Sequence, residues 1–132
     1  GQETGGRRGL AARKQGAVWL TINSGAPGKQ GHVDGKAANA KMRAQGFQST
    51  AYLLDGDGAI GRAYGARTTP HMFVIAPDGT LAYAGGIDSI PSANPADIAK
   101  AEPLARLAIT QVAAGKPVET PTSKPYGCSV KY

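Results

Sequence analysis

An antiparallel hairpin is predicted by residues 68–86, which read TTPHMFVIAPDGTLAYAGG. The apolar run Met72–Ile75 has the length and composition of a buried strand. Ala76–Gly79 then places Pro and Gly where a tight reversal needs them, and Thr80–Ala84 supplies the partner strand. Pro70 stands just before the first strand, and the local sequence alone does not decide whether the peptide bond that enters it is trans or cis.

Strands and helices alternate upstream of this hairpin. Residues 17–23 (AVWLTIN) are apolar at nearly every position, which is typical of a strand covered on both faces in a parallel sheet. Residues 34–45 favour a helix capped by Asp34, residues 50–54 a second strand, and residues 59–64 a short helix. Alternation implies parallel pairing, so the sequence predicts an α/β fold in which helices lie on both faces of a mixed sheet.

Two helical segments are predicted downstream of the hairpin. Asn94 suits an N-cap and Pro95 the first helical position, so a short helix begins there. Pro103 would cost ~3 kcal/mol in a helix interior, which predicts a new helix that starts at this residue and ends before Gly115. Residues 116–132 contain three prolines and no periodicity, so we expect an extended tail at the surface.

Length and composition favour one compact domain. The chain has 132 residues, 41% of them hydrophobic, and its 19 Gly and 9 Pro stay below the share that is typical of disorder. No apolar run approaches the ~20 residues of a membrane helix. Residues 1–16 are expected to form a flexible start and the end of a helix. A chain that begins at Gly1 without a signal segment suggests that something was removed upstream.

Positive charge is concentrated at the two ends and in the first third of the chain. The net charge is +6, with 15 Lys and Arg against 9 Asp and Glu. A nucleic-acid module would cluster its basic residues and interleave them with aromatic ones. The basic doublets, Arg7-Arg8 and Arg13-Lys14, have no aromatic residue between them. We therefore expect a solvated basic start and no nucleic-acid partner.

Several short motifs fail their own requirements. Residues 56–61 spell G-x-G-x-x-G, but only a short helix can follow, and Asp55 and Asp57 would place negative charge where a phosphate must lie. The same acidic residues lack the further ligands of a calcium loop. His32 and His71 are far apart in sequence and have no cysteine or carboxylate partners at metal-binding spacing. The sequence predicts no metal and no cofactor.

Cys128 is the one cysteine of the chain, so an intramolecular disulfide is excluded. Its thiol is a possible nucleophile, because Lys124 and Lys131 would stabilise a thiolate if they lie close to it in space. The other interpretation is a lone thiol that is packed against the body of the protein by its tail. Both interpretations stay open at the level of the sequence.

Taken together, the segments resemble the thioredoxin-like superfamily, specifically bacterial redoxin proteins related to the peroxiredoxin and thiol-specific antioxidant group. The likeness spans about residues 16–132 and is carried by nine spaced motifs. These motifs are residues 16–24 (GAVWLTINS), 26–31 (APGKQG), 54–58 (LDGDG), 62–66 (RAYGA), 69–75 (TPHMFVI), 78–85 (DGTLAYAG), 87–88 (ID), 114–118 (AGKPV) and 126–132 (YGCSVKY).

The resemblance implies a thioredoxin-like mixed sheet with a core at residues 17–115 and an extended tail at 116–132. It implies a cis bond before Pro70, and it makes Thr69, Pro70 and His71 the candidate substrate-binding residues, with Thr69 offering backbone groups to an extended thiol substrate. The implied partners are a thiol or disulfide protein or a peroxide. Family members are often exported, which favours the bacterial periplasm, with the cytoplasm still possible.

The departure from the family is the absence of its redox cysteine. In the family this cysteine follows a core strand that precedes the strand at residues 17–23, and this chain begins after that point. The chain is therefore expected to be N-terminally truncated, the C-terminal part of a thiol–disulfide oxidoreductase or peroxiredoxin-like antioxidant protein. The alternative is a non-catalytic thioredoxin-fold module that binds extended peptides. A third hypothesis is a protein that binds acidic partners through its basic ends.

Overall fold

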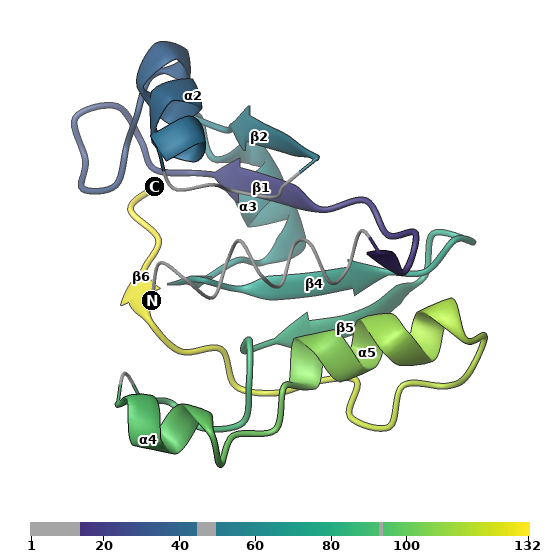
Figure 1. Ribbon diagram of the computed structural model, residues 1–132. Helices are drawn as coiled ribbons and strands as arrows, with labels where there is room; N and C mark the ends of the chain where they lie inside the picture. The colour runs from purple at the N-terminus through teal and green to yellow at the C-terminus, as the bar shows by residue number, and fades with distance from the viewer. Residues whose placement is uncertain (1–13, 45–49, 93) are drawn as a thin grey trace. The chain divides into compact units, whose positions relative to one another are not determined.

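The computed structural model describes residues 14–44, 50–92 and 94–132 (Figure 1). The chain divides into two compact units. Unit 1 comprises Gly1–Arg67 and Ser129–Tyr132, and unit 2 comprises Thr68–Cys128. Most of the predicted flexible start at residues 1–16 lies outside the described residues.

Unit 1 contains a parallel pair of strands with two helices. Strands β1 (Leu20–Asn23) and β2 (Ala51–Leu54) pair in parallel, with Ile22 opposite Leu53. Helix α2 (Gly35–Ala44) packs against β2, and helix α3 (Ala59–Tyr64) follows β2 along the chain. The sequence predicted all four elements and their parallel pairing.

Local signals explain where the helices of unit 1 begin and end. The Asp34 carboxylate accepts a hydrogen bond from the Ala37 backbone N–H at 2.7 Å, which confirms the predicted cap of α2. Gly65 ends α3 with a φ of 70°, in the left-handed region that glycine adopts without strain. These two boundaries, the start of α2 and the end of α3, are therefore set by residues within a few positions of them.

The apolar face of β1 is not covered as predicted. Leu20 is 51% exposed and Ile22 is 39% exposed. The register places these side chains on the same face as Leu53, because paired residues of a parallel ladder point to the same side. The expectation of a strand covered on both faces was wrong for this chain, since no described element of unit 1 buries that face.

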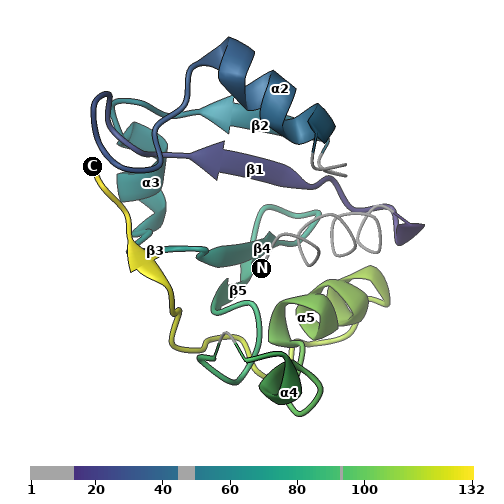
Figure 2. The same ribbon diagram turned by 60° about the vertical axis from the view of Figure 1, so that its left-hand side comes forward.

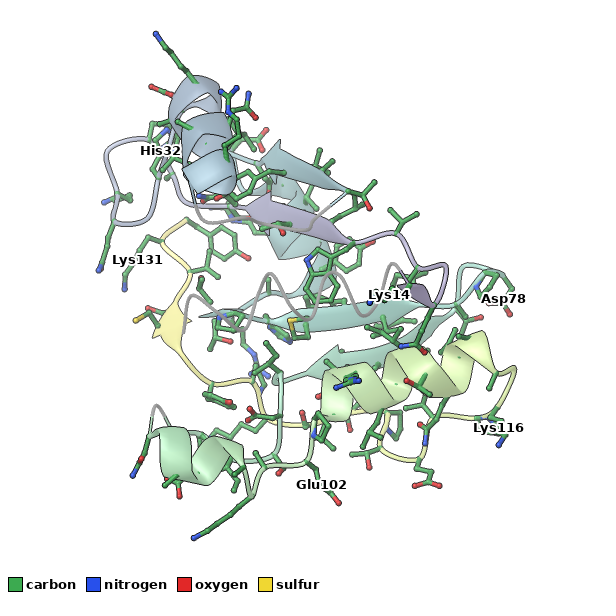
Figure 3. All side chains as sticks on the ribbon, in the orientation of Figure 1. Lys14, His32, Asp78, Glu102, Lys116 and Lys131 are labelled. Atoms are coloured by element: carbon green, nitrogen blue, oxygen red, sulfur yellow. The ribbon has the colours of Figure 1, made fainter. Side chains whose placement is uncertain are left out.

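Unit 2 is built on the predicted hairpin. Strands β4 (Met72–Ile75) and β5 (Leu81–Gly85) pair antiparallel. The turn between them closes through a hydrogen bond from Gly79 N to Ala76 O at 2.9 Å. Hydrogen bonds from Thr80 to the Asp78 carboxylate lower the pKa of Asp78 and tighten the same turn, which lies at one end of the hairpin in Figure 3.

Two helices and a buried core complete unit 2. Helix α4 (Pro95–Ile98) is capped by Asn94, whose side chain accepts a hydrogen bond from Ala96 N at 3.0 Å. Helix α5 (Leu104–Ala113) packs against β4 and β5, as Figure 2 shows. The core consists of Val74, Tyr83, Leu104, Ala105 and Ala108.

The tail forms more secondary structure than the sequence predicted. Strand β6 (Cys128–Ser129) is the hydrogen-bonded neighbour of β3 (Thr68–Thr69), and Thr122 forms an isolated parallel bridge with Ala84. These short pairings have no hydrophobic periodicity, so the sequence pattern gave no sign of them.

The described strands form three separate two-stranded sheets, β1–β2, β3–β6 and β4–β5. The structure therefore shows a mixed α/β fold with small parallel and antiparallel sheets. Among the described residues, no helix has the length and apolar character needed to cross a membrane.

Candidate functional site

The loop Thr69-Pro70-His71 leads directly into β4 of unit 2. The peptide bond between Thr69 and Pro70 is cis, as the resemblance implied. Thr69 and Pro70 are exposed and His71 is half-buried. The hydroxyl of Thr68, a residue of β3, donates a hydrogen bond to the Pro70 carbonyl at 2.9 Å and so connects β3 to the loop.

His71 stacks its imidazole ring on the ring of Phe73. The two ring centroids are 4.4 Å apart and the planes are inclined by 23°. His71 directly precedes β4 and Phe73 lies two positions later, and side chains two positions apart in extended backbone point to the same face. This stacking orients the imidazole beside the exposed loop.

The tail brings Cys128 next to this loop. Gly127 packs so closely on the loop that a Cβ atom built on it would lie 2.2 Å from the Thr69 carbonyl oxygen. Gly127 also has a φ of 135°, which side chains disfavour, so both space and backbone conformation require glycine there. Cys128 itself is exposed and forms no disulfide. The structure thus gathers Thr69, Pro70, His71 and the Cys128 segment on one side of unit 2.

A closed set of hydrogen bonds around Ser123 holds the tail against β5. The Tyr83 hydroxyl donates to the Gly86 carbonyl at 2.5 Å and lies 2.6 Å from the Ser123 hydroxyl, which accepts from Gly86 N at 2.9 Å. Gly85 leaves room for this contact, since a Cβ there would lie 2.3 Å from Ser123 Oγ. Every polar atom of the set has a partner, as buried polar groups require.

Tyr83 and Asp88 are the buried titratable groups of this region. Tyr83 is fully buried and Asp88 is 7% exposed. Burial raises the pKa of Tyr83, the hydrogen bond with Ser123 lowers it, and the Asp88 charge raises it further. The Asp88 carboxylate also accepts a short hydrogen bond from the Tyr126 hydroxyl, which anchors the tail just before Gly127.

Unit 1 contains a second buried carboxylate, Asp55. Its oxygens accept hydrogen bonds from Ser24 Oγ at 2.7 Å, Gly61 N at 2.8 Å and Ile60 N at 3.1 Å. Burial acts to raise the pKa of Asp55, but these hydrogen bonds outweigh it and lower the pKa. Asp55 thus satisfies the backbone N–H groups of Ile60 and Gly61, which lie at the start of α3 and within the 56–61 motif.

His32 belongs to unit 1, whereas His71 belongs to unit 2. Its Nδ1 atom is 2.8 Å from the Gly25 carbonyl oxygen, within the loop that follows β1. In the described parts of the chain, no group of three or more His, Cys, Asp or Glu side chains is placed to hold a metal ion.

Sequence reasoning missed the contacts that attach the tail. The sequence did not predict the contacts of Ser123, Asp88 and Tyr126, because their partners are about 40 positions away in sequence. The available signal was the pair Gly85-Gly86, which directly follows the predicted strand Thr80–Ala84. Glycine at a strand end also marks the close approach of another chain segment, and here that segment is the tail.

The site presents an accessible thiol segment and an exposed proline loop. A thiol, as its thiolate, can attack a disulfide sulfur and form a mixed disulfide. An exposed extended loop can bind another chain by backbone hydrogen bonds. β6 already pairs with β3, so the tail takes up backbone groups on one edge of the loop.

Comparison with known proteins relates the fold to two solved structures. No protein-family model and no curated protein matches the chain. A hypothetical protein from Sinorhizobium meliloti is 26% identical, with a TM-score of 0.81 over 99% of this chain and 70% of the other. An uncharacterized conserved protein from Geobacillus kaustophilus is 22% identical, with a TM-score of 0.82 over 99% of this chain and 68% of the other. The chain therefore shares its mixed α/β fold with these two longer proteins.

Proposed function

We propose that this chain is the C-terminal part of a thioredoxin-like redoxin, which acts as a thiol–disulfide oxidoreductase or a peroxiredoxin-like antioxidant protein. The supporting observation is the state of β1. Among the described residues β2 is its one strand partner, while Leu20 and Ile22 are largely exposed. Half of the backbone groups of a strand point away from a single partner. A further strand and helix upstream of Gly1 would pair that edge and cover that face.

The order of elements agrees with the same proposal. A parallel pair is followed by the loop Thr69-Pro70-His71, an antiparallel hairpin and a last helix, which is the order that the resemblance implies. The match to longer solved structures over 99% of this chain is compatible with a missing part elsewhere in the polypeptide.

The reaction would use a thiolate upstream of this chain. With a disulfide substrate, the thiolate attacks one sulfur, a new S–S bond forms, and the other sulfur leaves as a thiolate. With a peroxide, it attacks one oxygen, the O–O bond breaks, the cysteine becomes a sulfenic acid, and water or an alcohol leaves after protonation. In both cases the contribution of this chain would be to hold the substrate at Thr69, Pro70 and His71.

The test is the natural polypeptide in insulin-reduction and peroxide-consumption assays. We expect the coding sequence upstream of Gly1 to specify a strand and a helix that carry a cysteine. Replacing that cysteine by serine should abolish activity, while Cys128→Ser should retain most of it. An upstream sequence without such a cysteine, or activity that depends on Cys128 alone, would contradict the proposal.

A non-catalytic module for extended peptides is the second candidate. It is favoured by the cysteine count, because Cys128 is the one cysteine of the chain and lies on its tail. Binding of an extended peptide by the natural polypeptide, without turnover in either assay and unchanged in Cys128→Ser, would support this alternative against the enzyme.

A further inference from the structure

Residues 121–128 of the tail run along unit 2 from β5 to β3, and we call this segment the strap (Figure 1). The Pro121 carbonyl accepts a hydrogen bond from Ala84 N at 3.0 Å, and Ser123 N donates one to the Ala84 carbonyl at 3.2 Å. At the other end of the strap, Cys128 begins β6, which is the hydrogen-bonded neighbour of β3. The strap is therefore bound through its backbone at both ends.

Two side chains attach the strap to buried polar groups. The Ser123 hydroxyl lies 2.6 Å from the hydroxyl of the fully buried Tyr83, and the Tyr126 hydroxyl donates to the Asp88 carboxylate. In the described part of the chain, the hydrophobic core of unit 2 and the apolar side chains packed against it include no residue of the strap. A hydrogen bond broken on release is largely replaced by hydrogen bonds to water. The strap can therefore detach without loss of the core.

The end of the strap covers the backbone of Thr69. A Cβ atom built on Gly127 would collide with the Thr69 carbonyl, and it would lie 2.9 Å from the carbonyl carbon and 3.4 Å from Pro70 Cδ. In an extended strand the N–H and C=O of one residue point to the same edge. The edge of Thr69 that the strap covers is therefore the edge at which both of its backbone groups are available.

An extended peptide that adds to a strand forms its hydrogen bonds with these same backbone groups. We propose that the strap is an autoinhibitory segment, which occupies the backbone edge of Thr69 until it is released and an extended polypeptide substrate takes its place. The inference rests on the proposed function, which places the substrate at Thr69, Pro70 and His71, and it adds the regulation of that site. The apparent affinity for substrate then falls in proportion to the fraction of molecules whose strap is released.

The first test is Tyr126→Phe in the natural polypeptide, which removes one hydroxyl from the strap and leaves Thr69, Pro70 and His71 unchanged. The probe is fluorescein-labelled, S-carboxymethylated insulin B chain, an unfolded polypeptide without disulfides, and fluorescence anisotropy measures its binding. We expect binding about fivefold tighter than to the unchanged protein, because loss of one hydrogen bond increases the released fraction. Thr122→Ala is the matched control on the strap, and it should change the affinity by less than about twofold, because Thr122 is exposed.

The second test measures release of the strap directly by hydrogen–deuterium exchange. Exchange of residues 121–128 should rise in Tyr126→Phe, while exchange of α5 should stay unchanged. Gly127→Ala should release the strap further and tighten binding by about tenfold, because its φ of 135° is strained for alanine and the added Cβ meets the Thr69 carbonyl. A strap that neither variant loosens is a fixed part of unit 2, and that result would overturn the proposal.

The two readouts require no turnover, so they separate this inference from the proposed function. Loosened variants that bind the B chain no more tightly than Thr122→Ala would refute autoinhibition, even if the natural polypeptide reduces insulin. Tighter binding in the loosened variants, without turnover in either assay, would leave autoinhibition standing and refute the oxidoreductase.

Discussion

Units 1 and 2 each carry a two-stranded sheet, yet they bury their apolar side chains to very different degrees. In unit 2, α5 covers the hairpin, and Tyr83 and Ala108 are completely buried. In unit 1, Ala38 is the one hydrophobic side chain that is classed as buried in the described residues, and Leu20 is half exposed. The difference depends on which elements pack on each sheet, because a sheet face is buried only when a helix or another sheet packs on it.

The comparison teaches that unit 1 depends on polar contacts where unit 2 depends on packing. Asp55 accepts two hydrogen bonds from backbone N–H groups at the start of α3 and one from Ser24, and the Tyr132 hydroxyl donates one more to Ala66, just after α3 ends. The net contribution of a hydrogen bond to folding stability is about 1 kcal/mol, whereas full burial of a leucine side chain contributes roughly 1.5–3 kcal/mol. Four substitutions, in order of decreasing effect, can break or sharpen this contrast.

The largest effect is expected from Leu104→Ala in the core of unit 2. Leu104 is 7% exposed and packs with Val74 and Tyr83, so truncation should lower the free energy of unfolding by about 2–4 kcal/mol. Leu107 on the same helix is 42% exposed and serves as the matched control, with a loss under about 1 kcal/mol. Urea unfolding followed by circular dichroism measures both, and equal losses would remove the contrast.

Ser123→Ala tests whether the tail belongs to the packed part of unit 2. The change leaves the buried Gly86 N–H without an acceptor and takes a partner from Tyr83, so a loss of about 1–3 kcal/mol is expected. Thr122→Ala is the control, because Thr122 is exposed and its bridge to Ala84 is a backbone pairing. A Ser123→Ala chain as stable as the Thr122→Ala chain would show that the tail docks without these hydrogen bonds.

Asp55→Asn tests the polar anchoring of unit 1 through its pH dependence. Because folding lowers the pKa of Asp55, its contribution is present above the ordinary value of 3.8 and is lost as the pH falls through the folded-state pKa. The variant should be about 1 kcal/mol less stable at pH 7, and the gap should close in acid. Denaturation between pH 2 and 7 measures it. A stability difference that widens in acid would contradict the expected pH dependence. Asp57 is an exposed neighbour, and Asp57→Asn is the control, which should lower the stability at pH 7 by less than Asp55→Asn does.

The smallest effect in this chain is expected from Ile22→Asp, because Ile22 is already 39% exposed. A loss under about 0.5 kcal/mol is expected here, and one above about 2 kcal/mol in the longer natural polypeptide, where the proposed upstream elements would bury this position. Leu81→Asp on β5, 51% exposed, should have a small effect in both proteins. If Ile22→Asp is equally mild in both, the face of β1 has no partner in the longer protein.

Most elements were predictable because their signals are local. Asp34 and Asn94 cap helices through atoms two or three residues away, and the turn at 76–79 closes on itself. The candidate site was predictable only in part. The sequence and its resemblance identified the candidate residues Thr69, Pro70, His71 and Cys128. They did not predict that Cys128 lies beside the loop, because this depends on the contact between Gly127 and Thr69, which are 58 positions apart.

By itself the sequence determined the order of strands and helices, the hairpin and the caps, since each depends on neighbouring residues and on hydrophobic periodicity. Only the tertiary structure decided that β1 stays exposed, that Ser123 and Tyr126 attach the tail to unit 2, and that the Tyr132 hydroxyl binds the Ala66 carbonyl. The physical reason is that burial and long-range hydrogen bonds are properties of pairs of residues distant in the chain, and a single residue does not specify its partner.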